Sequence, residues 1–227
     1  MKVRTAAAVT AMGLVLAAVS GCGGSTTTDE QSYQIAEPID ALVVDARAAA
    51  VTIESGDGPV AVTETYRYAD DKPATTHRVD GSTLRLTDNG CRNDDVRCAV
   101  EFRVHLPAAA RAEITAQAET VKVTGLTGNV SVSTQAGAVE GRALGGDEVT
   151  ISTQAGAADL EFAQVPSTVR AATEVGAIEV RLPGGASYAV DVQTTVGSSD
   201  VSVQRDPASP HKIEVRTNVG AVKVRNL

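Results

Sequence analysis

Apolar and polar residues alternate in short runs along the C-terminal half of the chain, and glycines punctuate the runs. Each run ends in threonine, a polar residue, a small residue and glycine, and this core recurs every 19 to 23 residues. Regular recurrence at this period is typical of repeat proteins. The five clear copies end at Gly137, Gly156, Gly176, Gly197 and Gly220. Two degenerate copies, in which Ala49 and Glu119 replace the glycine, bring the number of repeats to seven.

The apolar positions have a period of two on both sides of each glycine, which predicts two short β-strands per repeat. The alternation shifts by one residue across the glycine, so we expect a sharp corner where glycine can adopt positive φ. At Ala49 and Glu119 we expect corners of a different build. The column seven positions before the corner consists of Leu42, Ala112, Val130, Val149, Val169, Val190 and Ile213.

A repeat of about 20 residues cannot bury its own apolar face, but stacked copies form a continuous core. The sequence therefore predicts an all-β fold, a parallel β-solenoid of about seven two-strand repeats with rungs about 4.8 Å apart. The threonine three positions before each glycine falls on the inward side, and we expect these threonines to stack into a hydroxyl ladder. A twisted sandwich of β-hairpins would satisfy the same alternation.

A different element fills the 70 residues between the first two corners. Residues 60–68, 83–87 and 99–106 alternate as strands, and Asp80-Gly81 is a turn signal between two of them. We interpret residues 60–107 as an antiparallel insert that covers the N-terminal end of the solenoid. At the C-terminal end we expect either a docking edge or an edge blunted by Lys223 and Arg225.

The start of the chain matches a bacterial lipoprotein signal. Lys2 and Arg4 precede an apolar run at 6–18, which is too short for a membrane span. Small residues then lead to Cys22 in a lipobox, where the thiol receives the lipid before cleavage. We expect a signal peptide at 1–21, a lipidated flexible tether at 22–38 and one β-repeat domain at 39–227. The lipid would hold the domain to the outer leaflet of the cell membrane.

Two further cysteines, Cys91 and Cys98, bracket a short polar segment inside the insert. Outside the cytoplasm, closely spaced cysteines usually form a disulfide, and we expect this bond to pin the insert. A redox or metal pair is the alternative. It would be expected to show CxxC spacing or histidine ligands nearby, and the sequence has neither.

Composition and charge narrow the range of partners that the protein could bind. The formal charge is −8, and it becomes −10 once the signal segment with its two basic residues is removed. An acidic body without a basic cluster argues against nucleic acid and against docking on anionic lipid. Aromatic residues make up 3% with no Trp, so platforms for stacking bases are scarce and sugar clefts are disfavoured. The three histidines lie in separate segments, and no catalytic, metal or cofactor motif is present.

One outward column of charges is a candidate site. It lies three positions after the corner, and its acidic members are Glu140, Asp159, Glu179 and Asp200. Stacked in register about 5 Å apart, these carboxylates could bind a hard cation such as Ca²⁺. The next outward column contains Arg142 and Arg181, close enough to neutralise them. These arginines favour the alternative of a salt-bridged, solvated face.

From about residue 40 to 227, the iterated Thr-x-(Ala/Val)-Gly-(Ala/Ser) segments resemble a bacterial envelope family of "putative adhesins" with β-strand repeats, a domain family of unknown function. The composition and the lipobox look like those of an actinobacterial member. The resemblance implies a solenoid-like fold and an envelope location, and it supplies no catalytic residues.

We therefore predict a lipid-anchored, non-catalytic protein that binds an envelope protein or glycan. A structural lipoprotein that self-associates through its C-terminal end is one alternative. A carbohydrate-active enzyme of the β-helix type is another, disfavoured because no carboxyl pair with distinct acid and base environments can be identified.

Overall fold

The computed structural model describes residues 26–47, 49–90 and 98–227, and every regular element in these ranges is a β-strand. The predicted all-β class is therefore confirmed, and no segment in these ranges forms a helix able to span a membrane. The strands are β1 (Thr27–Ile35), β2 (Ala41–Ala46), β3 (Ala49–Ser55), β4 (Val60–Tyr68), β5 (Thr75–Asp80), β6 (Thr83–Asp88), β7 (Ala99–Leu106), β8 (Arg111–Ala116), β9 (Val121–Thr124), β10 (Val130–Ala136), β11 (Val139–Leu144), β12 (Glu148–Ala155), β13 (Ala158–Phe162), β14 (Thr168–Val175), β15 (Ile178–Leu182), β16 (Ala189–Ser202) and β17 (Lys212–Asn226).

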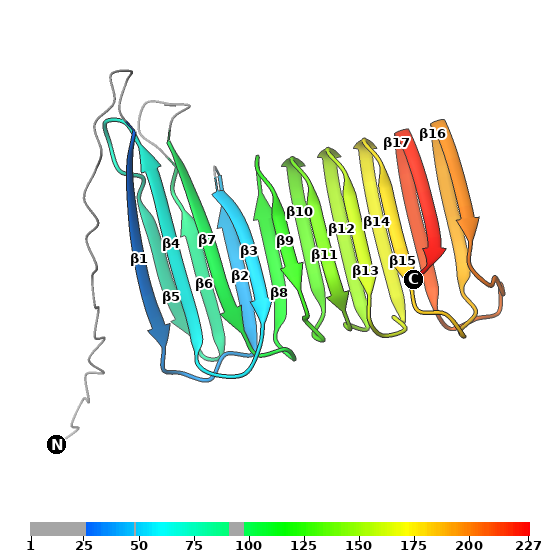
Figure 1. The fold of residues 1–227 in the computed structure, drawn as a ribbon, viewed down its shortest axis with the longest axis horizontal. Coiled ribbons are helices and arrows are strands. Elements are labelled where there is room, and N and C mark those ends of the chain that lie inside the picture. The colour runs from blue at the N-terminus through cyan, green and yellow to red at the C-terminus, as the bar shows by residue number, and fades with distance from the viewer. Residues whose placement is uncertain (1–25, 48, 91–97) are drawn as a thin grey trace.

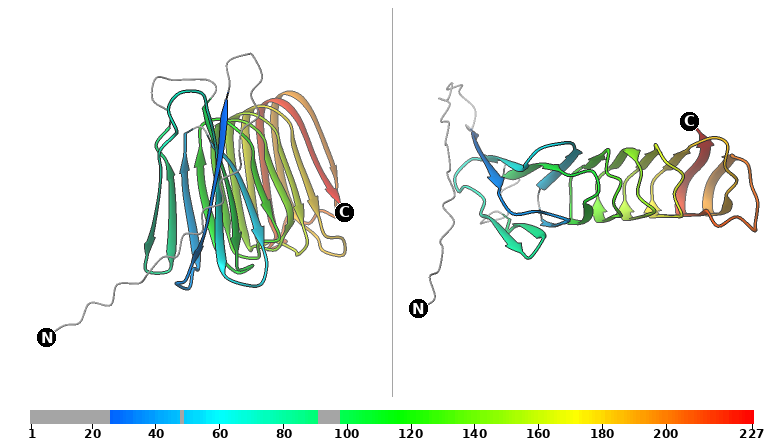
Figure 2. Two further views of the ribbon diagram at one scale, coloured as in Figure 1. Left: turned by 60° about the vertical axis from the view of Figure 1, so that its left-hand side comes forward. Right: turned by 90° about the horizontal axis from the view of Figure 1, so that it is seen from below.

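The strands stack as rungs that run to a corner and back (Figure 1). Each rung is made of two strands, except that β16 and β17 are single strands that continue through the corner. The outgoing strands pair in parallel to form a first layer, which contains β6, β2, β8, β10, β12 and β14. The returning strands form a second layer from β7, β3, β9, β11, β13 and β15. Figure 2 shows these layers as the two long sides of a narrow stack. The mostly parallel, solenoid-like architecture agrees with the prediction.

The core lies between the two layers, where the predicted apolar columns meet. The column seven positions before the corner is buried along most of the stack, as at Val130, Val149, Val169 and Ile213. Its strands pair residue for residue, so that Val130 lies beside Val149 and Val149 beside Val169. Period-two alternation thus places one continuous apolar face inward and leaves the polar face to solvent.

The corners require glycine for two reasons, the positive φ of the backbone and the lack of space for a side chain. Gly176 has a φ of 152°, and a Cβ there would lie 1.8 Å from the carbonyl oxygen of Gly156 in the next rung. No other residue fits that space. Glu119, which we expected to form a different corner, also has positive φ, at 111°. A Cβ at Gly137 would lie 2.0 Å from the carbonyl oxygen of Glu119, so this contact continues along the stack.

The end of the stack differs from the expected order. β17 pairs with β14 and β15 on one side and with β16 on the other, so β16 is the outermost rung. The prediction that the C-terminal segment forms the open edge is therefore wrong. The physical reason lies in the apolar columns, because Ser199 of β16 stands opposite Val222 of β17. The more apolar β17 takes the inner place, and β16, which leaves less apolar surface exposed, takes the edge.

The other end also differs in detail. β6 and β7 pair in parallel with β2 and β3, so the insert at 60–107 contributes a further rung rather than an antiparallel unit only. This gives eight rungs in the described ranges, against the predicted seven. Antiparallel strands then close the end, with β5 on β6, β4 on β7 and β1 on β4. The capping role predicted for the insert thus belongs to β4 and β5, together with β1.

The predicted tether is shorter than expected, because residues 27–35 form strand β1. Tyr33 and Ile35 are buried, so packing overrides a composition rich in threonine, serine and glutamine. The signal peptide, Cys22 and Cys91 lie outside the described residues. Cys98, the residue immediately before β7, is buried, and its bond to Cys91 remains a prediction.

Candidate functional site

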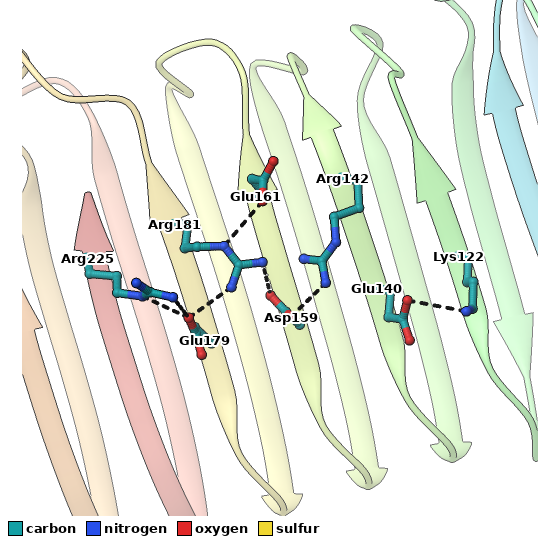
Figure 3. Close-up of polar contacts among 8 residues, drawn as sticks. All are labelled: Lys122, Glu140, Arg142, Asp159, Glu161, Glu179, Arg181 and Arg225. Carbon is teal, nitrogen blue, oxygen red and sulfur yellow. Dashed lines mark hydrogen bonds and ion pairs between the residues drawn. The ribbon is translucent and has the colours of Figure 1, made fainter. Parts of the chain in front are cut away.

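Charged side chains cover the outer face of the second layer in two columns (Figure 3). Glu140, Asp159 and Glu179 stack in register on β11, β13 and β15. Lys223 comes next in this column, and Asp200 lies beyond it on β16. The expected run of four adjacent carboxylates is therefore wrong at Asp200, because β17 is inserted between β15 and β16.

Arginines from the neighbouring column join these carboxylates into what we call the ionic ladder. Arg181 is its centre, with only 14% of its side chain exposed, and its nitrogens lie 2.6 Å from Asp159 and 2.9 Å from Glu179. Glu161 is 3.3 Å away on the same guanidinium. Three outer pairs complete the ladder, namely Lys122–Glu140 at 3.4 Å, Arg142–Asp159 at 2.8 Å and Arg225–Glu179 at 2.6 Å.

The ladder favours the ionised form of two of its carboxylates, Asp159 and Glu179. A hydrogen bond from Arg142 lowers the pKa of Asp159, and Arg181 adds to the effect. A hydrogen bond from Arg225 lowers the pKa of Glu179 in the same way. A general acid needs a raised pKa, and two carboxyls that share the work of acid and base need pKa values pushed apart. Asp159 and Glu179 meet neither condition.

The ladder also matches the salt-bridged alternative better than a cation stripe. Each of its carboxylates is already paired with at least one arginine or lysine. Across the described ranges, no group of three or more His, Cys, Asp or Glu side chains is arranged to hold a metal ion. The histidines lie apart, since His77 stacks on Tyr33 while His105 and His211 approach backbone carbonyls.

The outer face of the first layer is different in character. One of its columns carries Val43, Glu113, Ser131 and Thr150 in register on successive rungs. These residues line a shallow groove of about 420 Å³, which also takes in the side chain of Arg111. We call this the first-layer groove.

Two of the four charged residues that line the first-layer groove remain available to a partner, since Arg85 is paired with Asp80 and Glu148 with Arg170. Glu113 and Arg111 are exposed, and neither has an ion pair within the described part of the chain. Towards the corners the face continues in uncharged hydrogen-bonding side chains, and Thr115, Ser133 and Ser152 stack in register there. Sequence reasoning missed this surface, because its residues are ordinary solvent-facing positions until the rungs are stacked.

A family model described as Toastrack DUF4097 matches residues 45–225, which is most of the chain. The chain belongs to the Toastrack DUF4097 family. The predicted resemblance to a β-repeat family of unknown function is thereby confirmed, whereas the lipoprotein signal and the actinobacterial origin stay predictions. No curated protein matches this toastrack chain.

Solved structures share the toastrack fold. One is a "putative cell adhesion protein" from Clostridium sporogenes, at 16% identity and a TM-score of 0.56 over 88% of this chain and 100% of that one. Another is a "putative adhesin" from Bacteroides fragilis, at 13% identity and a TM-score of 0.49 over 91% of this chain and 100% of that one. The first likeness shows the common fold.

A second polar group lies inside the closed end of this toastrack. Glu64 of β4 is 2% exposed and accepts hydrogen bonds from the hydroxyls of Tyr33, Tyr66 and Thr75. Burial, together with the hydrogen bond to Glu64, raises the pKa of Tyr33 and of Tyr66. The group ties β1, β4 and β5 together and has no free polar atom to offer a ligand. Glu64 falls on the inward side of the alternating residues 60–68, so its burial could have been predicted from the sequence.

Proposed function

We propose that this protein is an exported, lipid-anchored, non-catalytic binding protein that holds an envelope protein or glycan in the first-layer groove. The structural neighbour from Clostridium sporogenes is named a "putative cell adhesion protein", and a binding role agrees with that name. The lowered pKa values of Asp159 and Glu179 argue against the alternative of a carbohydrate-active enzyme on the ladder face.

The contrast between the two outer faces carries the proposal. On the second layer, arginines and lysine are matched to carboxylates within the chain, so a partner would have to break existing ion pairs. The first-layer groove contains paired charges too, at Arg85 and Glu148. Its Arg111 and Glu113, however, have no ion pair in the described ranges and stand among serine and threonine hydroxyls. Unpaired charges of both signs next to hydroxyls suit a polar partner that brings its own donors and acceptors.

The predicted anchor agrees with the geometry of β1. Thr27 lies five residues after Cys22, so an extended connection would span at most about 18 Å. Thr27 pairs with Tyr68, at the end of β4 that lies on the corner side of the stack (Figure 1). A lipid on Cys22 would therefore hold the corners towards the membrane, with the strands and the first-layer groove standing upright on it.

The test begins with the whole chain expressed in a bacterial host. Labelled fatty acid should enter the wild-type protein and should not enter Cys22→Ser, which should leave the membrane fraction. The mature lipoprotein is then used to capture partners from envelope extract and is applied to a glycan array. A saturable protein or glycan partner supports the proposal. Labelling without any saturable partner on either assay would contradict the binding role while retaining the anchor.

A further inference from the structure

The outermost rung leaves one edge of the sheet open. β16 is 14 residues long, bends at Gly197 and pairs with β17 along one side. Within the described ranges, no strand pairs with its other side, apart from a bridge between Tyr188 and Arg205 just before the strand begins. Unpaired N–H and C=O groups along such an edge are a template for another strand.

The core is open at the same place. Val190, Val192 and Val201 of β16 are only half-buried. Their partners one rung inward, Ile213, Val215 and Val224, are fully buried. The apolar columns therefore run out to the end of the stack without a cover, whereas β4 and β5 cover the opposite end.

Exposed apolar side chains gather near the same end. Val175, Val219 and Val196 immediately precede three corner glycines and stack in register on the last three rungs. They are 54%, 46% and 59% exposed. We call them the corner ridge. This ridge continues up to β16 and stops at the open edge.

The occupant of this edge is best identified by elimination. The segment between Cys22 and β1 is short and attaches at the opposite end of the stack, so it cannot reach β16. A head-to-tail polymer would have to pair β16 with the outer edges of β1 and β5 at the other end, and the mostly exposed, polar side chains of these two strands do not continue the apolar columns. A second copy that presents its own β16 brings the same unpaired edge and the same half-buried valines. A two-fold contact of this kind is isologous and closes on itself.

The anchor selects the orientation of the two-fold axis, and here the inference rests on the proposed function. Both copies must keep β1, and hence their corners, towards one membrane, so the axis must run parallel to the strands. That rotation places the first layer of one copy in line with the second layer of the other. The outgoing half of β16, before Gly197, therefore meets the returning half of the other copy's β16, after Gly197. These halves run in opposite directions and would pair antiparallel, as β5 does with β6 at the closed end. Confinement to one membrane raises the effective concentration of the copies.

We propose that two anchored copies of this chain pair through β16 about a two-fold axis parallel to the strands, which joins their corner ridges into one ridge. Val196 immediately precedes the corner where the two layers meet, so in this dimer the two Val196 residues lie beside the axis, one inter-strand spacing of about 4.8 Å apart along the stack. Val175 lies two rungs further in, so its two copies are separated by about 24 Å, or five such spacings. A disulfide needs Cα atoms within about 7 Å.

Matched cysteine variants test this geometry in the full-length protein in membranes. Val196→Cys and Val175→Cys have similar exposure and occupy the same column, and wild type controls for the native cysteines. With added oxidant, Val196→Cys should form at least about tenfold more cross-linked dimer than Val175→Cys, because only the first meets the distance limit. Adding Val192→Lys at the open core should abolish the cross-link, while melting of the variant shows that it is folded.

The outcomes separate the dimer from the anchor. Absence of a Val196→Cys cross-link in protein that fractionates with the membrane would overturn the dimer and leave the anchor standing. Equal cross-linking at both positions would indicate random collision and would also overturn it. A Val196→Cys cross-link in protein that does not fractionate with the membrane would support the pairing and contradict the anchor.

Discussion

The hydroxyl of Thr217 donates a hydrogen bond to the backbone carbonyl of Gly176 in the neighbouring rung, over 3.2 Å. Thr173 makes the same contact with Gly156 and Thr194 with Gly220, each over 3.4 Å. In these three repeats the threonine and the corner glycine of a neighbouring rung are therefore partners rather than independent features. The threonines stack in register as expected, but these three hydroxyls bond to corner carbonyls and not to one another.

Replacing a corner glycine should be costly. Gly176→Ala would force a Cβ against the carbonyl of Gly156 at a φ that side chains rarely adopt, so we expect a loss of at least about 2 kcal/mol in the free energy of unfolding. Gly184→Ala is the matched control, because nothing lies within 4 Å of its Cβ position. Its effect should stay within about 0.5 kcal/mol. Urea unfolding measures both, and equal stability of the two variants would refute the corner contact.

The threonine contact can be tested without changing volume greatly. Thr217→Val removes the donor to Gly176 and should cost about 1 kcal/mol of unfolding free energy. Thr153 is buried in the same column, but its hydroxyl has no hydrogen-bond partner within the described ranges. Thr153→Val should therefore be neutral or stabilising. A loss at residue 153 as large as that at residue 217 would show that the hydrogen bond does not matter.

Much of the fold could be predicted from the sequence because each repeat carries its own pattern. Period-two alternation and a glycine at fixed spacing specify two strands and a corner, and stacking follows from the inability of one repeat to bury its face. The order of the last rungs could not be predicted in this way. β17 lies one rung further in than β16 because it buries Val222 where β16 has Ser199. That comparison can be made only when the register of the two strands is known.

The site was predictable only in part, for the same reason. Glu140, Asp159 and Glu179 stack as the columns indicated, whereas Asp200 is displaced by the change in rung order. The first-layer groove could not be predicted, since Arg111 and Glu113 become neighbours of Ser131 and Thr150 only through pairing between repeats. Strand β1 was missed because its burial depends on β4, which follows it in sequence by 24 residues.

The ionic ladder predicts a gain of cation binding on mutation. Arg181→Met leaves Asp159, Glu161 and Glu179 without the guanidinium that they share. Because Arg181 is mostly buried, its removal should lower the free energy of unfolding by about 1–3 kcal/mol. Millimolar Ca²⁺ should raise the melting temperature of this variant and leave that of wild type unchanged. Arg216→Met is the control, since Arg216 is exposed and its one ion pair within the described ranges is with Asp191, at 3.7 Å. A Ca²⁺ response in wild type would revive the cation stripe.

The buried tyrosines predict a loss of stability in alkali. Burial and Glu64 raise the pKa of Tyr33 and Tyr66 above the ordinary value of 10 in the folded chain only. Below pH 10 both states hold the protons, and above it the unfolded chain loses them first. The free energy of unfolding should then fall by up to about 1.4 kcal/mol per pH unit for each tyrosine. Urea unfolding between about pH 9 and pH 11 measures this fall. Tyr33→Phe should make it shallower, and an unchanged slope would contradict the raised pKa of Tyr33.

The most direct measurement compares partner affinity between the two outer faces. Ser131→Arg fills the first-layer groove beside Glu113, whereas Thr124→Arg places the same side chain on the exposed face of the second layer. With the captured envelope partner in a titration, Ser131→Arg should weaken binding at least about tenfold, equivalent to 1.4 kcal/mol, and Thr124→Arg should leave it unchanged. Unchanged affinity in Ser131→Arg, or an equal loss in both variants, would contradict the first-layer groove as the binding site.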